Sequence, residues 1–232
     1  MYTYQDFLRV SESEKTDFVR SVITAHTGSQ KYRFAQTAEA YYKRRNETIM
    51  NFRKLLYTVT GKQIPDNYST NYKLRSNWFN YFTVQLNQYL LSNGVMWTEN
   101  GTKEALGSKF DTQLKKLSRN ALVHGAAFGF WNLDHIEVYS FLEFAPLYDE
   151  ENGALMAGVR FWQLDLTKPL RATLFEPDGY TEYIWRTSNE GKESGEILKE
   201  KRPYIQITRT TEAEGTEIYD GQNYPAFSVV HD

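Results

Sequence analysis

Residues 108–165 read SKFDTQLKKLSRNALVHGAAFGFWNLDHIEVYSFLEFAPLYDEENGALMAGVRFWQLD, and this stretch decides the fold class. Ser108 and Asp111 have the S-x-x-D spacing of a capping box at a helix start. Apolar residues then recur at spacings of four, three and four along one helical face: Phe110, Leu114, Leu117 and Ala121. Gly125 supplies a C-terminal stop. The stretch therefore begins with an amphipathic helix that ends at Gly125.

After Gly125 the period of the pattern changes towards two. Asp134 and His135 sit where a turn is needed, between alternating apolar positions at Phe128, Phe130, Ile136, Val138 and Phe141. We expect Pro146 to end the second strand and residues 149–153 to form a turn. The pattern resumes as a strand over 157–165. The sequence therefore predicts a helix, a β-hairpin and a further strand.

The rest of the chain divides near Gly125. Before it we expect helices at 11–28, where Ser11 and Glu14 form the cap, at 29 to about 45, at about 46–57 and at about 76–91, with a loop at 61–69. After it we expect strands separated by turns at 177–179 and 220–221 and by a charged loop at 187–196. The segment YPAFSVVHD at 224–232 is also strand-like. Because helices and strands are segregated, the sequence favours an α+β fold, with N-terminal helices (1–125) packed on a mostly antiparallel β-rich region (126–232).

Composition narrows the classes of function. The 232 residues include no cysteine, which excludes disulfides, thiolate metal sites and cysteine nucleophiles. A formal net charge of -2 and a pI near 6.1 argue against a protein that coats nucleic acid through bulk positive charge. Residues 1–20 contain no apolar signal region, and no window approaches the apolar length of a membrane span, so we expect no membrane association.

Four segments together resemble the tailed-bacteriophage portal proteins, the head-to-tail connectors, and specifically their siphophage-type branch. They are KYRFAQTAEAYYKRRNETI (31–49), NYSTNYKLRSNWFNYFTVQLNQYLLSNGVMW (67–97), LSRNALVHGAAFGFWNLDHIEVYSFLEFAPLYDEENGALMAGVRFWQLD (117–165) and ATLFEPDGYTEYIW (172–185). They are similar, in order, to the family's N-terminal helix, its asparagine-rich lead into a helix, its helix–Gly–hairpin–bend–strand unit and the strand and turn that follow. The resemblance covers most of the chain.

The resemblance implies that residues 1–125 and 126–232 are the mainly helical and the β-rich parts of a portal wing. It implies a probable fragment, because the family's stem, clip and crown would lie further along the chain. Family members form a dodecameric ring at one capsid vertex, the channel for DNA packaging and ejection and the attachment point for tail adaptors. Expected partners are further copies of the chain, the capsid, scaffolding, terminase and tail-adaptor proteins, and viral DNA in the channel. The expected location is the virion, after assembly in the bacterial host cytoplasm.

The portal family offers no catalytic, cofactor-binding or metal-binding residue to carry over, and we expect this chain not to be an enzyme. The sequence contains no phosphate-binding loop, no GxGxxG, no HExxH and no GxSxG. We interpret His124 as a cation that caps the end of its helix and His135 as part of a turn. The acids Asp149, Glu150 and Glu151 support an alternative, a metal-dependent hydrolase or nuclease, although they lack the spacing of a calcium loop.

Two further features concern partners. Basic residues exceed acids by five between positions 31 and 54, and they include Lys31, Arg33, Lys43, Arg44, Arg45, Arg53 and Lys54. This excess suits DNA contact, but the pattern favours a solvated or subunit-facing side of two helices over that contact. Aromatic clusters at Tyr41–Tyr42 and at Trp78, Phe79, Tyr81 and Phe82 are too wide for one buried stripe. We expect some of these rings to face a partner, and the 232-residue chain itself to be monomeric or weakly self-associating.

Overall fold

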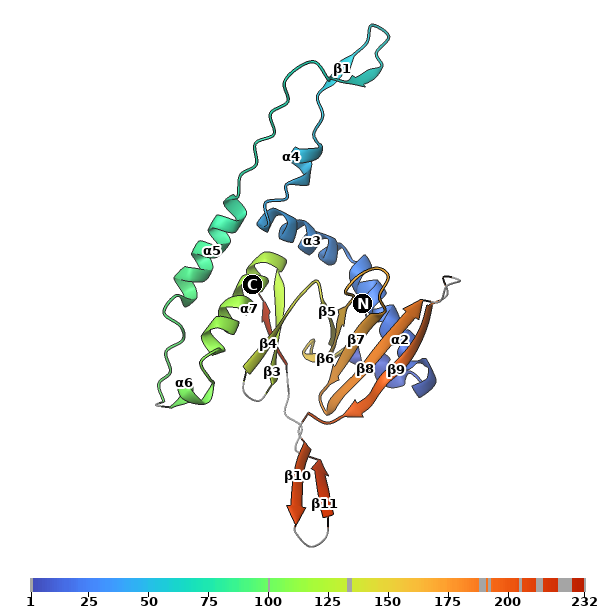
Figure 1. Ribbon diagram of the computed structural model, residues 1–232, viewed down its shortest axis with the longest axis vertical. Helices are drawn as coiled ribbons and strands as arrows, with labels where there is room; N and C mark the ends of the chain where they lie inside the picture. Colours follow the sequence, from blue (N-terminus) through green and yellow to red (C-terminus); the bar gives the residue numbers. More distant parts are fainter. Residues whose placement is uncertain are drawn as a thin grey trace.

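The computed structural model describes residues 2–99, 101–132, 135–187, 191 and 193–204, and the backbone of 206–211, 215–220 and 227–231. Helices occupy the first half of the chain (Figure 1): α1 Tyr4–Arg9, α2 Lys15–Gly28, α3 Gln30–Tyr42, α4 Glu47–Asn51, α5 Trp78–Leu91, α6 Thr102–Ala105 and α7 Phe110–His124, with a 3-10 turn at Glu12–Glu14. Only one short pair of strands, β1 Leu55–Tyr57 and β2 Gln63–Pro65, interrupts them in the described residues.

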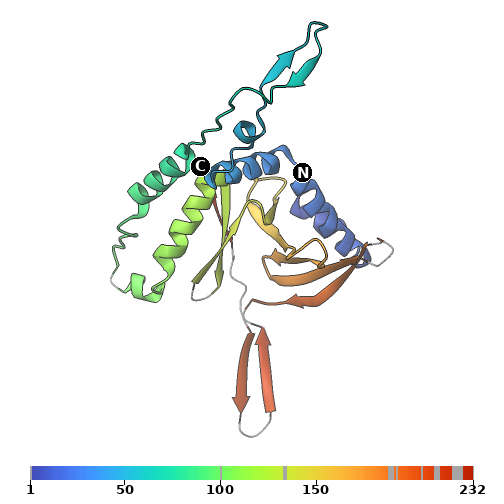
Figure 2. The same cartoon turned by 45° about the horizontal axis from the view of Figure 1, so that its top comes forward.

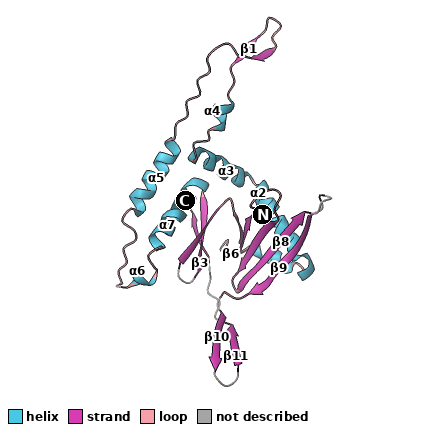
Figure 3. Cartoon of the chain, in the orientation of Figure 1, coloured by secondary structure: helices cyan, strands magenta, loops and turns pink. Residues whose placement is uncertain are grey.

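The second half consists of strands (Figure 3): β3 Ala126–Asn132, β4 His135–Ser140, β5 Phe144–Tyr148, β6 Leu155–Trp162, β7 Leu170–Glu176, β8 Gly179–Thr187, β9 Glu193–Arg202, β10 Gln206–Thr211, β11 Gly215–Asp220 and β12 Phe227–His231. They form a five-stranded sheet in the order β5-β6-β7-β8-β9, a three-stranded sheet in the order β12-β3-β4 and a hairpin of β10 and β11. Every pairing between these strands is antiparallel. The α+β prediction is confirmed.

The main core lies between α2 and the five-stranded sheet. Val19, Val22 and Ile23 project from one face of the helix and are all buried, and Phe7 from α1 joins them. Their spacing of three and four places them on one helical stripe. On the sheet side the contacts come from alternate positions of the strands, among them Ala157, Val159, Ala172 and Leu174. This helix is therefore fixed by the hydrophobic pattern that the sequence shows.

A second core joins the two sheets through aromatic rings. Phe128 and Tyr139 from the small sheet pack against Phe144 and Phe175 from the large one, and the Phe128 and Phe144 ring centroids are 4.5 Å apart. Gly158 makes this packing possible, because a Cβ at that position would lie 2.1 Å from Cζ of Phe144. The rings therefore hold the two sheets together without an intervening helix.

Helix α7 covers the small sheet, as its apolar face predicts. Leu117 and Ala121 are buried against Ala127 of β3 and Val138 of β4. The C-terminal stop is confirmed, because Gly125 has φ +82 and its N–H donates to the carbonyl of Ala121. The Ser108–Asp111 capping box is wrong: the N-cap is Lys109, and it makes no side-chain cap hydrogen bond.

Asp111 takes part in tertiary contacts in place of the expected cap. It accepts a hydrogen bond from the Val95 N–H (3.3 Å) and forms an ion pair with Lys103 (3.2 Å). These partners come from the loop that connects α5 to α7, so the carboxylate ties that loop to the helix start. Local spacing alone therefore gave the wrong partner for this side chain.

The region from 46 to 69 differs most from the prediction. Helix α4 ends at Asn51, and Leu55–Tyr57 pairs with Gln63–Pro65 where the sequence suggested the end of a helix and a loop. The connecting turn is closed by hydrogen bonds from the Gly61 N–H to the Thr58 carbonyl and from the Thr58 N–H to the Lys62 carbonyl. Gly61 has φ +78, which a turn glycine adopts without strain. The glycine was therefore the signal of a hairpin.

Two corrections concern the large sheet. Pro146 lies within β5, opposite Gly158, and does not end a strand. β5 is an edge strand, where a missing N–H costs no ladder hydrogen bond. The predicted charged loop at 187–196 is too long, because Glu193–Arg202 form β9, and every residue of β9 is exposed. Alternating charges on an edge strand made it resemble a loop in the sequence.

Other predicted elements agree with the structure. The predicted helices at 11–28 and about 76–91 are confirmed, the first beginning with the 3-10 turn, and α3 begins at its Ser29 cap but ends at Tyr42, before the expected 45. The expected Ser11–Glu14 cap is wrong, because neither side chain caps a backbone N–H and the Ser11 hydroxyl donates to the Glu14 carboxylate (2.6 Å). The turns at 149–153 and 177–179 are present, and Asp149 accepts from the Glu151 N–H (2.7 Å). Asp134 and Gly221 lie outside the described residues.

The strand expected near the end of the sequence is β12, which pairs with β3. No helix among the described residues is long and apolar enough to cross a membrane.

Candidate interaction surfaces

Helix α5 lies along the outer side of α7 (Figures 1 and 2), and two of its asparagine side chains donate hydrogen bonds to the body of the protein. Asn80 Nδ2 donates to the Tyr42 carbonyl (3.3 Å), and Asn87 Nδ2 donates to the Lys115 carbonyl (2.9 Å). Thr83 is the one residue of α5 that is buried. Phe79, Val84 and Leu91 of α5 are half-buried as well, so the side that faces the protein mixes polar and apolar residues.

The opposite side of α5 is apolar and exposed. Trp78, Phe82, Leu86 and Tyr89 follow one another at spacings of four, four and three, and Tyr81 lies beside them. The exposed fractions are 63% for Trp78, 59% for Phe82 and 85% for Tyr89. The rings of Trp78 and Phe82 are stacked, with centroids 5.9 Å apart. We call Trp78, Tyr81, Phe82, Leu86 and Tyr89 the α5 outer face; an ordinary surface helix turns large apolar residues of this kind towards the core.

The sequence identified part of this face. Trp78, Tyr81 and Phe82 were expected to be too many for a buried stripe, and all three are exposed, whereas Phe79 is half-buried. Leu86 and Tyr89 were not singled out. They are recognisable only when the helix is seen to turn its Asn80–Asn87 side towards α7. Whether these rings contact a partner remains a prediction.

Residues 52–76, which we call the arm, run away from the body and return to the start of α5 (Figure 1). Cross-links between the outgoing and returning segments hold the arm together. Lys54 Nζ donates to the Thr70 carbonyl (2.6 Å), and Asn71 Nδ2 donates to the Phe52 carbonyl (3.3 Å). At its base, the Arg44 and Arg75 guanidinium groups each donate to the other's backbone carbonyl at 3.3 Å. The arm is therefore a ribbon with a defined direction.

No residue of the arm is buried, although many of its side chains are apolar. The exposed fractions are 68% for Tyr57, 93% for Tyr68 and 86% for Leu74, and Val59 at the tip is fully exposed. A two-stranded ribbon is marginally stable by itself in water. Large exposed apolar surfaces of this kind mark interaction sites. The arm and the α5 outer face are thus the two surfaces that the chain's own packing does not explain.

His124 is part of the core, and the expected cation at a helix end is wrong. Its side chain is buried, and its Nε2 donates to Glu39 Oε2 at 3.0 Å, which ties α7 to α3. Burial lowers the pKa of His124, and this effect exceeds the opposing effect of Glu39. Its Nδ1 is buried without a hydrogen-bond partner in the described structure, so a proton there would have no acceptor. The neutral imidazole is therefore favoured.

The basic residues between 31 and 54 lie in different settings. Lys43 pairs with Glu39 (2.5 Å), and Arg44 and Lys54 donate to backbone carbonyls of the arm and its base. Arg33 and Arg45 line a depression of about 540 Å³ beside Tyr41 and Glu47. Lys31 lies elsewhere, at the junction of α2 and α3. Three of the seven basic side chains, those of Lys43, Arg44 and Lys54, therefore have partners within the chain. DNA contact by Lys31, Arg33, Lys43, Arg44 or Arg45 is still a prediction.

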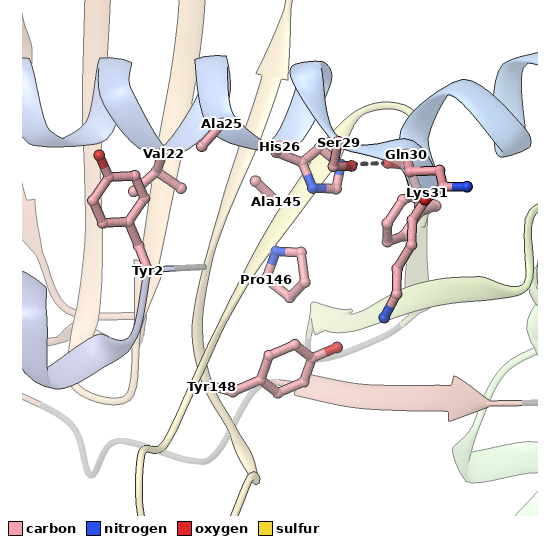
Figure 4. A pocket seen from close by; sticks show the side chains of 11 residues that line it. Tyr2, Val22, Ala25, His26, Ser29, Gln30, Lys31, Ala145, Pro146 and Tyr148 are labelled. Carbon is pink, nitrogen blue, oxygen red and sulfur yellow. Dashed lines mark hydrogen bonds between the residues drawn. The ribbon is translucent and has the colours of Figure 1, made fainter.

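A cavity of about 460 Å³ lies between the α2–α3 junction and β5. Figure 4 shows Tyr2 and Lys31 on opposite sides of it, with Pro146 and Tyr148 between them. His26 lines it but is engaged, because its Nε2 lies 2.8 Å from the Phe141 carbonyl, and burial lowers its pKa. Burial also raises the pKa of Tyr148. The cavity is shaped for an apolar group and presents no activated base.

The acidic residues considered for a metal site belong to a turn. Asp149 Oδ1 accepts from the Glu151 and Asn152 N–H groups, and its pKa is lowered chiefly by the Glu151 bond. Arg9 lies 3.8 Å from Glu150, at the edge of the same turn. His135 begins β4 and is not near these acids in the chain. Within the part of the chain that the structure describes, no three histidine or acidic side chains are grouped so that they could hold a metal ion.

The exposed apolar residues of the α5 outer face and of the arm are the features of the described residues that favour association with another macromolecule. Comparison with known proteins adds no identification, since no protein-family model matches the sequence and no curated protein matches it. The resemblance to portal proteins therefore rests on the sequence segments themselves.

Proposed function

We propose that the chain is the N-terminal part of a phage portal subunit, a structural component of the ring that forms the channel at a capsid vertex. In this role it passes DNA during packaging and ejection, receives tail adaptors and performs no catalysis of its own. Its partners are copies of itself, the capsid, scaffolding, terminase and tail-adaptor proteins, and the viral DNA. It assembles in the bacterial cytoplasm and ends in the virion.

The α5 outer face is the observation that carries this proposal. A single chain that exposes Trp78, Phe82 and Tyr89 to water while it turns Asn80 and Asn87 inwards gives up favourable burial. Such a helix is accounted for when its outer side is buried in an assembly. A closed ring of identical subunits uses two different faces of each subunit, and the arm supplies a second apolar surface. The order of the sequence segments selects portal rings among such assemblies.

The alternative, a metal-dependent hydrolase or nuclease, has no specific support in the described residues. Asp149 Oδ1 accepts from two backbone N–H groups of its own turn, and no grouped set of ligands accompanies it in the described residues. We therefore do not develop this alternative.

Negative-stain electron microscopy of the gene product extended to its natural stop codon tests the proposal. We expect rings with a central channel. The double variant Leu164→Ala with Leu166→Ala is a control for the loss of exposed apolar residues. These two residues are remote in sequence from α5, so this variant should still form rings. Monodisperse particles without a ring would overturn the portal assignment and leave the α+β fold unaffected.

A further inference from the structure

The arm and the α5 outer face carry complementary chemistry. Residues 52–76 contain five basic residues (Arg53, Lys54, Lys62, Lys73 and Arg75) and one acid (Asp66), which gives a net charge of 5 - 1 = +4. Helix α5 contains no charged residue, and its outer face presents aromatic rings. Lysine and arginine side chains are attracted to the faces of such rings. The arm also brings exposed aliphatic side chains, such as Leu55 and Val59, to the same contact.

The arm is held in a direction that keeps it from its own α5. The hydrogen bonds between Lys54 and Thr70 and between Asn71 and Phe52 tie the returning segment to the outgoing one. Figures 1 and 2 both show the β1–β2 hairpin beyond the N-terminal end of α5, extended away from the body. The outer face of α5 is therefore left free for an arm from elsewhere.

The area of the α5 outer face suits a contact between proteins. An aromatic side chain buries about 150–250 Å² when fully covered, so four rings that are more than half exposed offer on the order of 500 Å². Leu86 adds to this surface. One side of a standard protein interface is about 800 Å². The face alone accordingly supports a weak contact, and it reaches a stable one when repeated around a closed assembly.

We propose that the arm of one copy of this chain docks on the α5 outer face of the next copy. The contact is heterologous, since it joins two different surfaces, and it is built from aliphatic packing of the β1–β2 hairpin and from a cation of the hairpin turn, Lys62, over the rings of the α5 outer face. This inference rests on the proposed ring assembly, because it names the surfaces through which neighbouring subunits meet.

Disulfide trapping tests the contact without background, because the chain contains no cysteine. One population carries Tyr57→Cys on the arm and a second carries Leu86→Cys on α5; the two are mixed at high concentration and oxidised. We expect a mixed disulfide dimer at least tenfold above the yield of the control pair, Leu164→Cys with Leu86→Cys. Leu164 is 87% exposed and lies between β6 and β7. Equal yields from the two pairs would overturn the docking.

Two further outcomes would identify another occupant. If the double variant Tyr57→Cys with Leu86→Cys closes an internal disulfide in monomers at high dilution, the arm covers its own helix and the proposal fails. If Tyr57→Cys alone forms dimers as readily as the mixture, the arms meet each other in a two-fold contact, and the head-to-tail arrangement fails.

Sedimentation velocity gives an independent readout. Trp78→Ala with Phe82→Ala should weaken self-association by about tenfold or more, as removal of central aromatic anchors does. Leu164→Ala with Leu166→Ala should leave it unchanged. An unchanged association constant in the α5 variant would overturn the docking.

The docking and the proposed function fail in different ways. Rings seen by microscopy without the Tyr57–Leu86 disulfide would refute the docking and retain the portal assignment. The disulfide without rings would retain the docking, as an open head-to-tail contact, and refute the portal assignment.

Discussion

Helices α2 and α5 have the same length, 14 residues each, yet they use their apolar residues in opposite ways. α2 buries Val19, Val22 and Ile23 against the five-stranded sheet. α5 turns Asn80, Thr83 and Asn87 towards the protein and exposes Trp78, Phe82 and Tyr89. The orientation of α2 follows from burial within one chain. α5 leaves large aromatic rings exposed in the single chain, so the comparison separates the residues that fold the chain from those that the proposal assigns to assembly.

The largest expected effect comes from truncating the same kind of side chain on each helix. Ile23→Ala on α2 should lower the free energy of unfolding by about 2–5 kcal/mol, because it leaves a cavity against the sheet. Leu86→Ala on α5 should change it by less than about 0.5 kcal/mol, because Leu86 is 46% exposed in the single chain. Urea unfolding followed by circular dichroism measures both. Equal losses would mean that α5 is packed in the monomer and would break the comparison.

A smaller effect tests how tightly the two sheets are packed against each other. Gly158→Ala should destabilise the chain by about 1–3 kcal/mol, since a Cβ there would meet the Phe144 ring at 2.1 Å. The matched control is Gly28→Ala at the end of α2, where a Cβ meets nothing within 4 Å. That change should stabilise the helix by about 0.4–1 kcal/mol. Thermal melting of both variants decides the matter, and a neutral Gly158→Ala would show that the aromatic layer between the sheets is loose.

The smallest expected effect is a dependence of the free energy of unfolding on pH. It arises from one histidine on α2 and one on α7. Burial lowers the pKa values of His26 and His124 below the ordinary value of 6.5. Below pH 6.5 the unfolded chain therefore binds more protons than the folded chain, and the free energy of unfolding falls as the pH drops. Chemical unfolding between pH 7.5 and 5.5 measures this slope. α5 has no histidine or carboxylate and contributes none of it.

His26→Gln is the matched variant for the pH experiment. The glutamine amide can still donate to the Phe141 carbonyl but does not titrate, so the slope should become shallower. A slope that is the same in the His26 variant and the parent chain would show that this imidazole is not protected from protonation in the folded state.

Sequence reasoning succeeded where local and tertiary preferences agree. The amphipathic helix that ends at Gly125, the strands that follow and the Ser29 cap depend on side-chain periodicity and on backbone conformations that nearby residues impose. It failed at Pro146, because the sequence does not show that β5 is an edge strand. It failed at Asp111 for a related reason, since Lys103 and the Val95 N–H reach this carboxylate only in the folded chain.

The arm is another region where the local sequence pattern predicted the wrong structure. The run from 46 to 57 resembles a helix because its apolar residues are dense, but a glycine turn and a returning segment compete for the backbone hydrogen bonds. The aromatic excess at Trp78, Tyr81 and Phe82 was visible in the sequence. Which side of the helix those rings occupy became visible only when Asn87 was seen bonded to α7.

The sequence by itself determined the α+β class, the order of most helices and strands, the glycine stop before β3 and the presence of more aromatic residues than one buried stripe can hold. These features depend on periodicity and on backbone preferences, which act over a few residues. The tertiary structure alone decided that His124 is a buried partner of Glu39, that residues 52–76 form an arm and that α5 exposes its apolar side. Each of these depends on which distant segments compete for the same surface and the same hydrogen bonds, and that competition is settled only when the whole chain has folded.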